Sequence, residues 1–163
     1  MEIDSFKLAE NGWVPNNERL PVVVYRRVLD SSATDLAELF EALFAENGWP
    51  PDWRDGVFEY HHYHSTAHEA LGVFVGRATL ELGGPAGRQV DVVAGDALML
   101  PVGTGHRCVI SSDDFQVVGA YSEGTKWDIC RDAPDDVALS RMAALSDPRH
   151  DPVTGETGAR TGA

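Results

Sequence analysis

The segment HHYHSTAHE, from His61 to Glu69, places four histidines and one glutamate within nine residues. In an extended strand every second side chain points to the same face, so His62 and His64 share one face and His61 points to the other. Two imidazoles at this spacing can share a metal ion. Imidazole suits Zn, Fe, Ni and Cu, and a carboxylate widens the choice towards Mn. Glu69 begins the next expected strand, and a glycine-rich turn can deliver His106 as a further ligand.

These residues lie in two segments that resemble the paired sequence motifs of the cupin superfamily. The first motif, G-x5-H-x-H-x4-E-x6-G, is matched at Gly56, His62, His64, Glu69 and Gly76, so it spans residues 56–76. The second motif, G-x5-P-x-G-x2-H, is matched at Gly95, Pro101, Gly103 and His106, so it spans residues 95–106. The resemblance implies a double-stranded β-helix, or jelly-roll barrel. It also implies a divalent transition metal (Fe, Mn, Ni or Zn) held in the barrel mouth by His62, His64, Glu69 and His106.

Cupins often carry Asn four residues after the last of these histidines, where this chain has Ile110. That position is not a usual metal ligand, so the departure concerns only the hydrogen bonds around the site. The wider chain, with GWPPDWRDG, HHYHSTAHE, GTGH and GAY, resembles the small bacterial single-domain group called YjlB-like cupins. This closer resemblance sharpens the expected fold more than the expected function.

Each expected ligand also has a plainer explanation. His62 and His64 could be a hydrogen-bonded buried pair, because buried polar groups need partners in any case. His106 could be an ordinary turn residue, and Glu69 a surface carboxylate. Inside a barrel, however, an unpartnered carboxylate would be very costly. That cost and the nine matched motif positions favour the metal site.

The remaining polar residues near the motif are candidates for supporting roles. His61 is expected on the outer face or at an interface, away from the ligands. His68 lies in the turn before Glu69, where it is either a solvent-exposed turn residue or a proton carrier at the mouth. Tyr60 is the other catalytic candidate, because a buried phenol hydroxyl needs a partner. Strand alternation predicts pocket walls, or simply barrel core, at Phe58, Tyr60, Leu71, Val73, Met99, Cys108 and Ile110.

The elements around the motifs predict a mostly β fold with an N-terminal helix. A strand is expected over 21–28, and SSATDLAELFEALFAENGWPP reads as one helix capped by Ser32 or Thr34 and stopped by Gly48 and the two prolines. Its apolar stripe consists of Leu36, Leu39, Phe40, Leu43 and Phe44. Short strands punctuated by turn residues, typical of a sandwich or barrel, follow at 57–64, 69–76, 78–84, 88–95, 97–103, 106–112 and 115–122. A short helical segment is expected at 135–146.

Composition limits where the protein acts and what it binds. The chain of 163 residues suits one domain, 1–147, followed by a polar, glycine-rich tail, 148–163, that we expect to be flexible. The net charge of −13 disfavours nucleic acid and anionic membranes as partners. The first residues lack an apolar signal region, so a cytoplasmic location is the default expectation. Cys108 and Cys130 match no redox or zinc spacing, so we expect two free thiols.

Two classes of function are consistent with such a site. The first is a metalloenzyme, of oxygenase or isomerase type, acting on a small organic molecule at open metal positions. The second is a non-catalytic, metal-dependent module that binds or senses a small ligand. The sequence does not select the metal or the substrate. Cupins are often dimers, and residues 20–28 could provide an edge strand that pairs with a second subunit in a homodimer.

Overall fold

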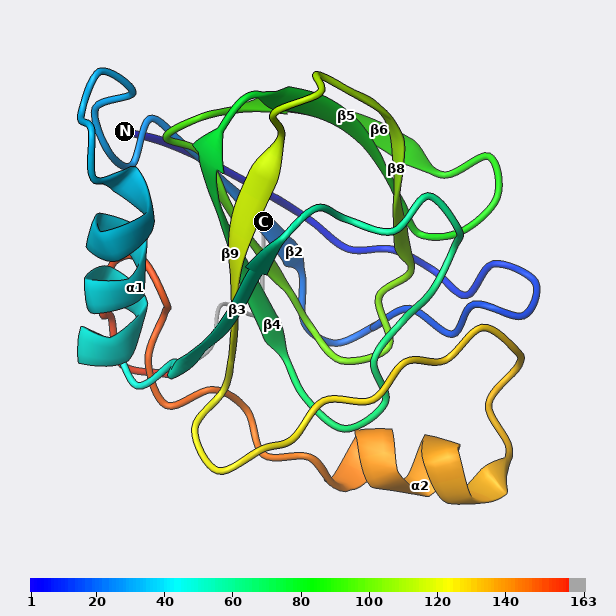
Figure 1. The fold of residues 1–163 in the computed structure, drawn as a ribbon. Helices are drawn as coiled ribbons and strands as arrows, with labels where there is room; N and C mark the ends of the chain where they lie inside the picture. Colours follow the sequence, from blue (N-terminus) through cyan, green and yellow to red (C-terminus); the bar gives the residue numbers. More distant parts are fainter. Residues whose placement is uncertain (159–163) are drawn as a thin grey trace.

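In the computed structural model, which describes residues 1–158, the chain folds into antiparallel strands and two helices (Figure 1). The elements, in chain order, are β1 Glu2–Phe6, β2 Val22–Arg26, α1 Leu36–Glu46, β3 Pro51–Asp55, β4 Glu69–Val75, β5 Arg77–Leu82, β6 Arg88–Val93, β7 Ala97–Leu100, β8 His106–Ser111, β9 Gln116–Tyr121 and α2 Asp136–Ala144. The predicted mostly β fold, with a helix near each end of the chain, is confirmed.

The strands form two sheets that pack face to face. The larger sheet has six strands in the order β1-β2-β7-β4-β9-β3, and the smaller has three in the order β6-β5-β8. All of their pairings are antiparallel. Strands distant in sequence are neighbours, as β4 is of β9, so the architecture is a jelly-roll-like β-sandwich (Figure 1).

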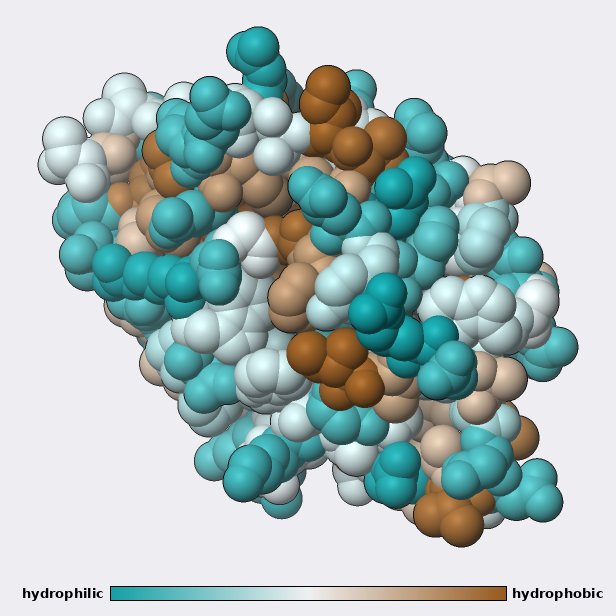
Figure 2. All heavy atoms as spheres, turned by 45° about the vertical axis from the view of Figure 1, so that its right-hand side comes forward, coloured by the Kyte–Doolittle hydropathy of each residue, from teal (hydrophilic) through white to brown (hydrophobic). Residues whose placement is uncertain are grey.

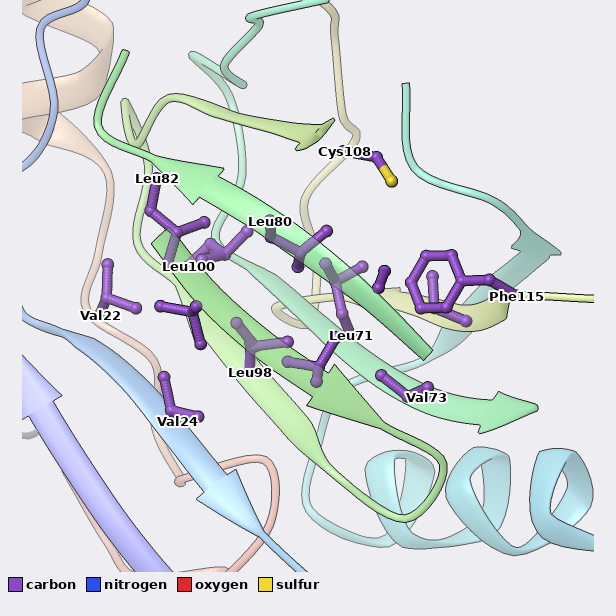
Figure 3. Packing of buried hydrophobic residues seen from close by; sticks show 14 of the residues in the cluster. Val22, Val24, Leu71, Val73, Leu80, Leu82, Leu98, Leu100, Cys108 and Phe115 are labelled. Carbon is purple, nitrogen blue, oxygen red and sulfur yellow. The ribbon is translucent and has the colours of Figure 1, made fainter. Parts of the chain in front are cut away.

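Alternation along the strands places one set of side chains between the sheets. On the larger sheet, Leu71 of β4 and Leu98 of β7 point inward, and on the smaller sheet Leu80 and Cys108 point towards them (Figure 3). These side chains are buried and belong to one apolar cluster. Burial of apolar area on this scale is the main source of stability for such a domain. Because Glu69 has the same parity as Leu71, it also points between the sheets.

The helix α1 covers the outer face of the larger sheet (Figure 1). Its buried side chains include Phe40 and Phe44, which pack with Ala70, Val118 and Met99 in a second cluster. The other half of the strand alternation therefore faces this helix. Met99 was predicted as a pocket wall, and that prediction is wrong because its neighbours Leu98 and Leu100 are the residues of β7 that point inward.

Details of the helix differ from the sequence expectation. The residue before its first turn is Asp35, not Ser32 or Thr34, and within the described chain its side chain forms no capping hydrogen bond. Leu39, placed on the apolar stripe, is 38% exposed, whereas Ala37 is buried. The helix buries a narrower stripe because a single flat sheet contacts it from one side.

A bulge in β8 explains a second wrong prediction. The register of β5 and β8 shifts between Thr79 and Leu80, so Cys108 pairs with Leu80 but Ile110 pairs with Thr79. The additional residue, Val109, reverses the alternation beyond it. Ile110, predicted to point inward, is instead 69% exposed.

Some expected strand boundaries also differ. Residues 57–64, predicted as a strand, form only isolated bridges at His62 and Tyr63. A strand that the sequence analysis did not predict, β3, begins at Pro51 and lies at an edge of the larger sheet, a position that tolerates proline. Residues 20–28 were expected at an edge, but β2 is internal because β1 and β7 flank it. That segment therefore cannot pair with a second subunit without displacing β1.

The segment predicted as a flexible tail packs against the domain over its first part. Asp151 accepts a hydrogen bond of 2.6 Å from the hydroxyl of Tyr25, and the carbonyl oxygen of His150 accepts one of 2.9 Å from the indole of Trp49. Val153 is buried with the residues beneath α1. The folded domain thus extends beyond residue 147, while residues 159–163 of the expected tail lie outside the described residues.

The surface carries mixed side chains. Figure 2 shows one face, on which hydrophobic side chains form small patches divided by hydrophilic ones. Among residues 1–158, neither helix has the length and apolar character that a membrane crossing requires. The expected free thiols are confirmed, with Cys108 buried and Cys130 partly so.

The docking of α1 depends on a close approach between Phe40 and the backbone of β4. A Cβ atom at Gly72 would lie 2.6 Å from Cγ of Phe40, which is closer than a Cβ atom comes to a non-bonded heavy atom in real structures. We expect Gly72→Ala to lower the free energy of unfolding by about 1–3 kcal/mol through overpacking, measured by urea denaturation. Gly56→Ala is the matched control, because the nearest atom to its new methyl group would be 4.0 Å away. Equal effects of the two substitutions would contradict this account of the helix contact.

Candidate metal centre

Three segments bring the predicted ligands together at one end of the space between the sheets. His62 forms a two-way backbone bridge with His106, with N–O distances of 3.2 and 2.9 Å. Tyr63, on the opposite edge of the same segment, bridges to Cys130. The segment is therefore held as a short extended piece, and His62 and His64 project to the same side as alternation predicted. Glu69 is the first residue of β4 and His106 the first of β8.

The ligand atoms of these residues converge. His62, His64 and His106 each offer a nitrogen atom, and these three atoms lie within 4.8 Å of one another. The carboxylate of Glu69 lies between two of the rings, with Oε2 3.1 Å from Nε2 of His64 and Oε1 3.2 Å from Nε2 of His106. All four side chains are buried. A buried histidine triad of this kind could hold a metal ion.

Backbone carbonyl groups fix the tautomer of every ring in the triad. The Nδ1 atoms of His62 and His106 lie 3.0 Å from the carbonyl oxygens of Tyr60 and Thr104, and Nδ1 of His64 bonds to that of Asp128. A carbonyl oxygen can only accept, so each Nδ1 must carry the proton. In its neutral form, each ring then presents the lone pair of Nε2 to the centre, which is how proteins orient metal-binding histidines.

The charges at the centre are strongly coupled. Burial disfavours the imidazolium form of His64, but the adjacent Glu69 carboxylate outweighs burial and raises the pKa of His64 to about 9. Burial also opposes ionisation of Glu69, but His64 and His106 hold its pKa well below the usual range. His62 differs, because burial and the neighbouring His106 lower its pKa to about 3. The metal-free centre thus contains a carboxylate, one imidazolium and a neutral His62.

One atom of this arrangement lacks a partner. Within residues 1–158, Oε1 of Glu69 is buried and accepts no hydrogen bond, although Nε2 of His106 is 3.2 Å away. With the proton of His106 on Nδ1, a lone pair faces the anionic oxygen, and such a buried contact is unfavourable. A divalent cation among the three nitrogens and this oxygen would satisfy all of them. The donor set of imidazole and carboxylate suits Zn, Fe, Mn or Ni. The residues present therefore fit a metal ion.

Two residues that the sequence analysis did not single out hold Glu69 in place. The hydroxyl of Tyr121 donates a hydrogen bond of 2.6 Å to Oε2 of Glu69 and accepts one of 2.9 Å from the indole of Trp53. Burial, and then the Glu69 carboxylate, raise the pKa of Tyr121, so its hydroxyl keeps its proton. A Cβ at Gly119 would lie 2.2 Å from the Trp53 ring, so glycine is required beneath it. Glu69 and Tyr121 are paired residues of the neighbouring strands β4 and β9. The sequence alone could not predict their contact, because it does not give the order of the strands in the sheet.

Asp128 supports His64 in a similar way. Its carbonyl oxygen holds Nδ1 of His64, and its carboxylate accepts a hydrogen bond of 2.7 Å from the backbone N–H of Ser65. The same carboxylate also accepts from the Ser65 hydroxyl and the Cys130 thiol. These contacts tie the irregular segment after β9 to the first motif. Nothing in the local sequence around Asp128 marks this role.

A cavity of about 620 Å³ opens over the centre. The four candidate ligands line it together with Asp52, Trp53, Asp55, Gly56, Val57, Phe58, Glu59, Leu71, Tyr121 and Trp127. Of the predicted wall residues, Phe58 and Leu71 line this cavity. Val73 and Cys108 point inward as expected but belong to the apolar core beside it. The volume is in the range that small-molecule ligands occupy.

The structure places the two catalytic candidates outside the cavity lining. The Tyr60 ring stacks on Phe58, with centroids 4.7 Å apart, and lies edge-on to His62, with centroids 5.6 Å apart. Tyr60 therefore packs against the candidate metal ligand His62 through its ring. The guanidinium carbon of Arg131 lies over the same ring, 3.7 Å from its centroid.

His68 is not the exposed turn residue that was expected. It is 1% exposed, its Nδ1 accepts a hydrogen bond from the backbone of Val102, and its Nε2 contacts the carbonyl oxygen of Ser146. Burial lowers the pKa of His68 to about 4, so it is neutral. It joins the turn before β8 to the end of α2. His61 lies away from the triad as predicted, 3.4 Å from Glu81.

The coupling of His64 to Glu69 predicts a pH dependence of stability without metal. The folded-state pKa of about 9 lies above the ordinary value of 6.5, so the stabilisation is complete below about pH 6.5 and is lost as pH rises towards 9. We expect the free energy of unfolding, measured with urea in the presence of a chelator, to fall across this interval. Glu69→Gln should flatten the dependence and His61→Gln should retain it. A wild-type stability that is constant from pH 6.5 to 9 would contradict the coupling.

Comparison with known proteins gives the chain a family but not an activity. No family model matches it. It is 35% identical over 159 residues to a protein of Bacillus subtilis (strain 168) named "Uncharacterized protein YjlB", and the match covers 95% of this chain and 92% of that protein. Identity at this level over nearly the full length of both chains shows common descent and a shared fold. The chain therefore belongs to the YjlB family.

Proposed function

We propose that this protein is a cupin that binds one divalent transition metal on His62, His64, Glu69 and His106. We further propose that it uses this centre as a small-molecule metalloenzyme, of oxygenase or isomerase type. The jelly-roll-like sandwich supports the cupin assignment, as do the nine matched motif positions.

One observation carries the proposal. Three carbonyl groups accept from Nδ1 of the histidines, so that the three Nε2 atoms face a buried carboxylate, one oxygen of which lacks a hydrogen-bond partner in residues 1–158. A purely structural cluster would leave no buried oxygen atom without a donor. This one pairs Oε2 of Glu69 with Nε2 of His64 but leaves Oε1 without a hydrogen-bond partner among the described residues, as a site prepared for a cation does.

The position of the centre supports catalysis rather than a purely structural role. All four candidate ligands line the cavity, so a bound ion would face the ligand space and not only protein. When bound, the metal would supply Lewis-acid or redox chemistry at positions open to substrate. Glu69 would contribute the negative charge that balances part of the charge of the ion.

The other residues around the centre orient Glu69 and bind the substrate. Tyr121, held protonated, keeps Glu69 in one orientation through its hydroxyl, and Trp53 in turn fixes that hydroxyl. Phe58, Leu71 and Trp127 provide an apolar surface that excludes water from a bound substrate. Exclusion of water strengthens the interaction of polar groups at the floor with the reacting part of the substrate.

The first prediction from this proposal concerns metal content and stability. Purified protein should carry close to one divalent metal per chain by elemental analysis. His62→Ala/His64→Ala should lose most of it, and His61→Ala, outside the triad, should keep it. Chelation should lower the melting temperature without abolishing the fold, because the apolar clusters form without the ion. Full metal content in the double variant would refute the ligand assignment.

The second prediction separates an enzyme from a binding module. Fe, Mn, Ni and Zn forms should be tested for oxygen uptake and product formation with small phenols, thiols, keto acids and sugars. We expect at least one form to turn over, and Glu69→Gln to reduce turnover by roughly tenfold or more while the protein stays folded. If no form turns over any compound, yet ligands shift the spectrum of the bound metal, the protein is a binding or sensing module instead.

A further inference from the structure

We infer that the cavity above the centre selects small molecules with a positively charged nitrogen, such as an ammonium group, and rejects anions of the same shape. This inference deepens the proposed function, because it names the class of molecule that the same cavity would take. Its support is the charge and the ring chemistry of the residues between the floor and the mouth.

The upper part of the cavity is acidic. Asp52, Asp55 and Glu59 line it, in addition to Glu69 at the floor. No Lys or Arg is among the described residues that line it. An anion that enters beside Asp52, Asp55 and Glu59 would lose hydration next to carboxylates of its own sign. A cation would be attracted to this part of the cavity, since a cleft lined by one sign of charge concentrates ligands of the opposite sign.

Two of the neighbouring arginines are already paired with other carboxylates. Arg54, next to Asp55 in the chain, pairs with Glu41 at 2.7 Å on the side of α1. Arg107, which contacts the carbonyl oxygen of Glu59, is paired with Glu81 at 2.8 Å. Within residues 1–158, neither Asp55 nor Glu59 takes part in an ion pair. Both carboxylates are therefore available to a ligand.

The walls between the carboxylates are aromatic. Tyr121 and Trp127 stack with ring centroids 5.8 Å apart and an angle of 18° between their planes. The indole N–H of Trp127 donates to the carboxylate of Asp52, which fixes the ring beside an acidic group. Indole and phenyl faces attract cations through their quadrupole. Rings and carboxylates together are the chemistry that recognises an ammonium group.

The floor of the same cavity is prepared for a group from outside the chain. Glu69 lines it, and its Oε1 atom, assigned above to the metal ion, is buried with no hydrogen-bond partner among the described residues. A protein that filled this space itself would have satisfied that atom. The floor therefore takes the metal of the proposed function, and the carboxylates nearer the mouth are left to the ligand.

Three probes of one shape test the inference: benzylamine, which is cationic at pH 7.5, neutral benzyl alcohol, and anionic benzoate. Their dissociation constants are measured by titration calorimetry on the full chain after chelator treatment. We expect benzylamine to bind at least about tenfold more tightly than benzoate, with benzyl alcohol between them, a preference of the size that charge and cation–π contacts provide. Equal or tighter binding of benzoate, or binding of none of the three, would overturn the inference.

Neutralisation of the mouth tests the cause. Asp55→Asn/Glu59→Gln should weaken benzylamine binding about tenfold and leave benzyl alcohol unchanged, in chelator-treated and as-purified protein alike. Glu46→Gln on α1, on the other side of the larger sheet, is the matched control and should change neither. An unchanged ratio of the two affinities would overturn the inference. Should the double variant not fold, the wild-type affinity for benzylamine must still fall with added salt, because opposite charges are screened.

The inference and the proposed function fail separately. Elemental analysis decides whether the triad holds a metal, and the probe titrations use chain without one. If the protein prefers the ammonium probe but never binds metal, only the proposed metal centre is refuted. If the protein binds metal but prefers benzoate after chelation, only the inferred selection for cationic ligands is refuted.

Discussion

A buried carboxylate is the constraint around which the site is organised. Glu69 is enclosed between the sheets, and a charge in that position is tolerated only with partners close by. Tyr121 and His64 supply two of them, and the oxygen atom near His106 is left to a cation. The irregular segment before β4, the turn before β8 and the end of β9 all meet at this residue. The fold therefore brings three separate pieces of chain to one charge.

Sequence patterns predicted the parts of the site that depend on spacing. The i, i+2 relation of His62 and His64 holds even though residues 57–64 are not a regular strand, because bridges to His106 and Cys130 extend the backbone locally. Most strands were predicted from short segments divided by turn residues, and α1 from its apolar stripe. Glu69 and His106, which lie at the first residues of β4 and β8, were anticipated from motif positions.

The rest depended on sheet order and on local irregularities that no pattern reports. The partner of Glu69 across the sheet, Tyr121, lies 52 residues further along the chain. The bulge at Val109 turned Ile110 outward, and the buried His68 contacts the chain after α2, at the carbonyl oxygen of Ser146. Each of these outcomes was decided by tertiary packing, which overrides alternation and local preference.

The return of the C-terminal segment to β2 affects how the chain reaches its native state. The hydrogen bond from Tyr25 to Asp151 joins residues 126 positions apart, and Trp49 meets His150 across 101 positions. Contacts of such sequence separation make folding slow, because a large loop must close before they form. During synthesis on the ribosome, β2 and the end of α1 emerge long before the residues that complete their packing. The packing of Tyr25 and Trp49 is therefore completed only after residues 150 and 151 have been translated.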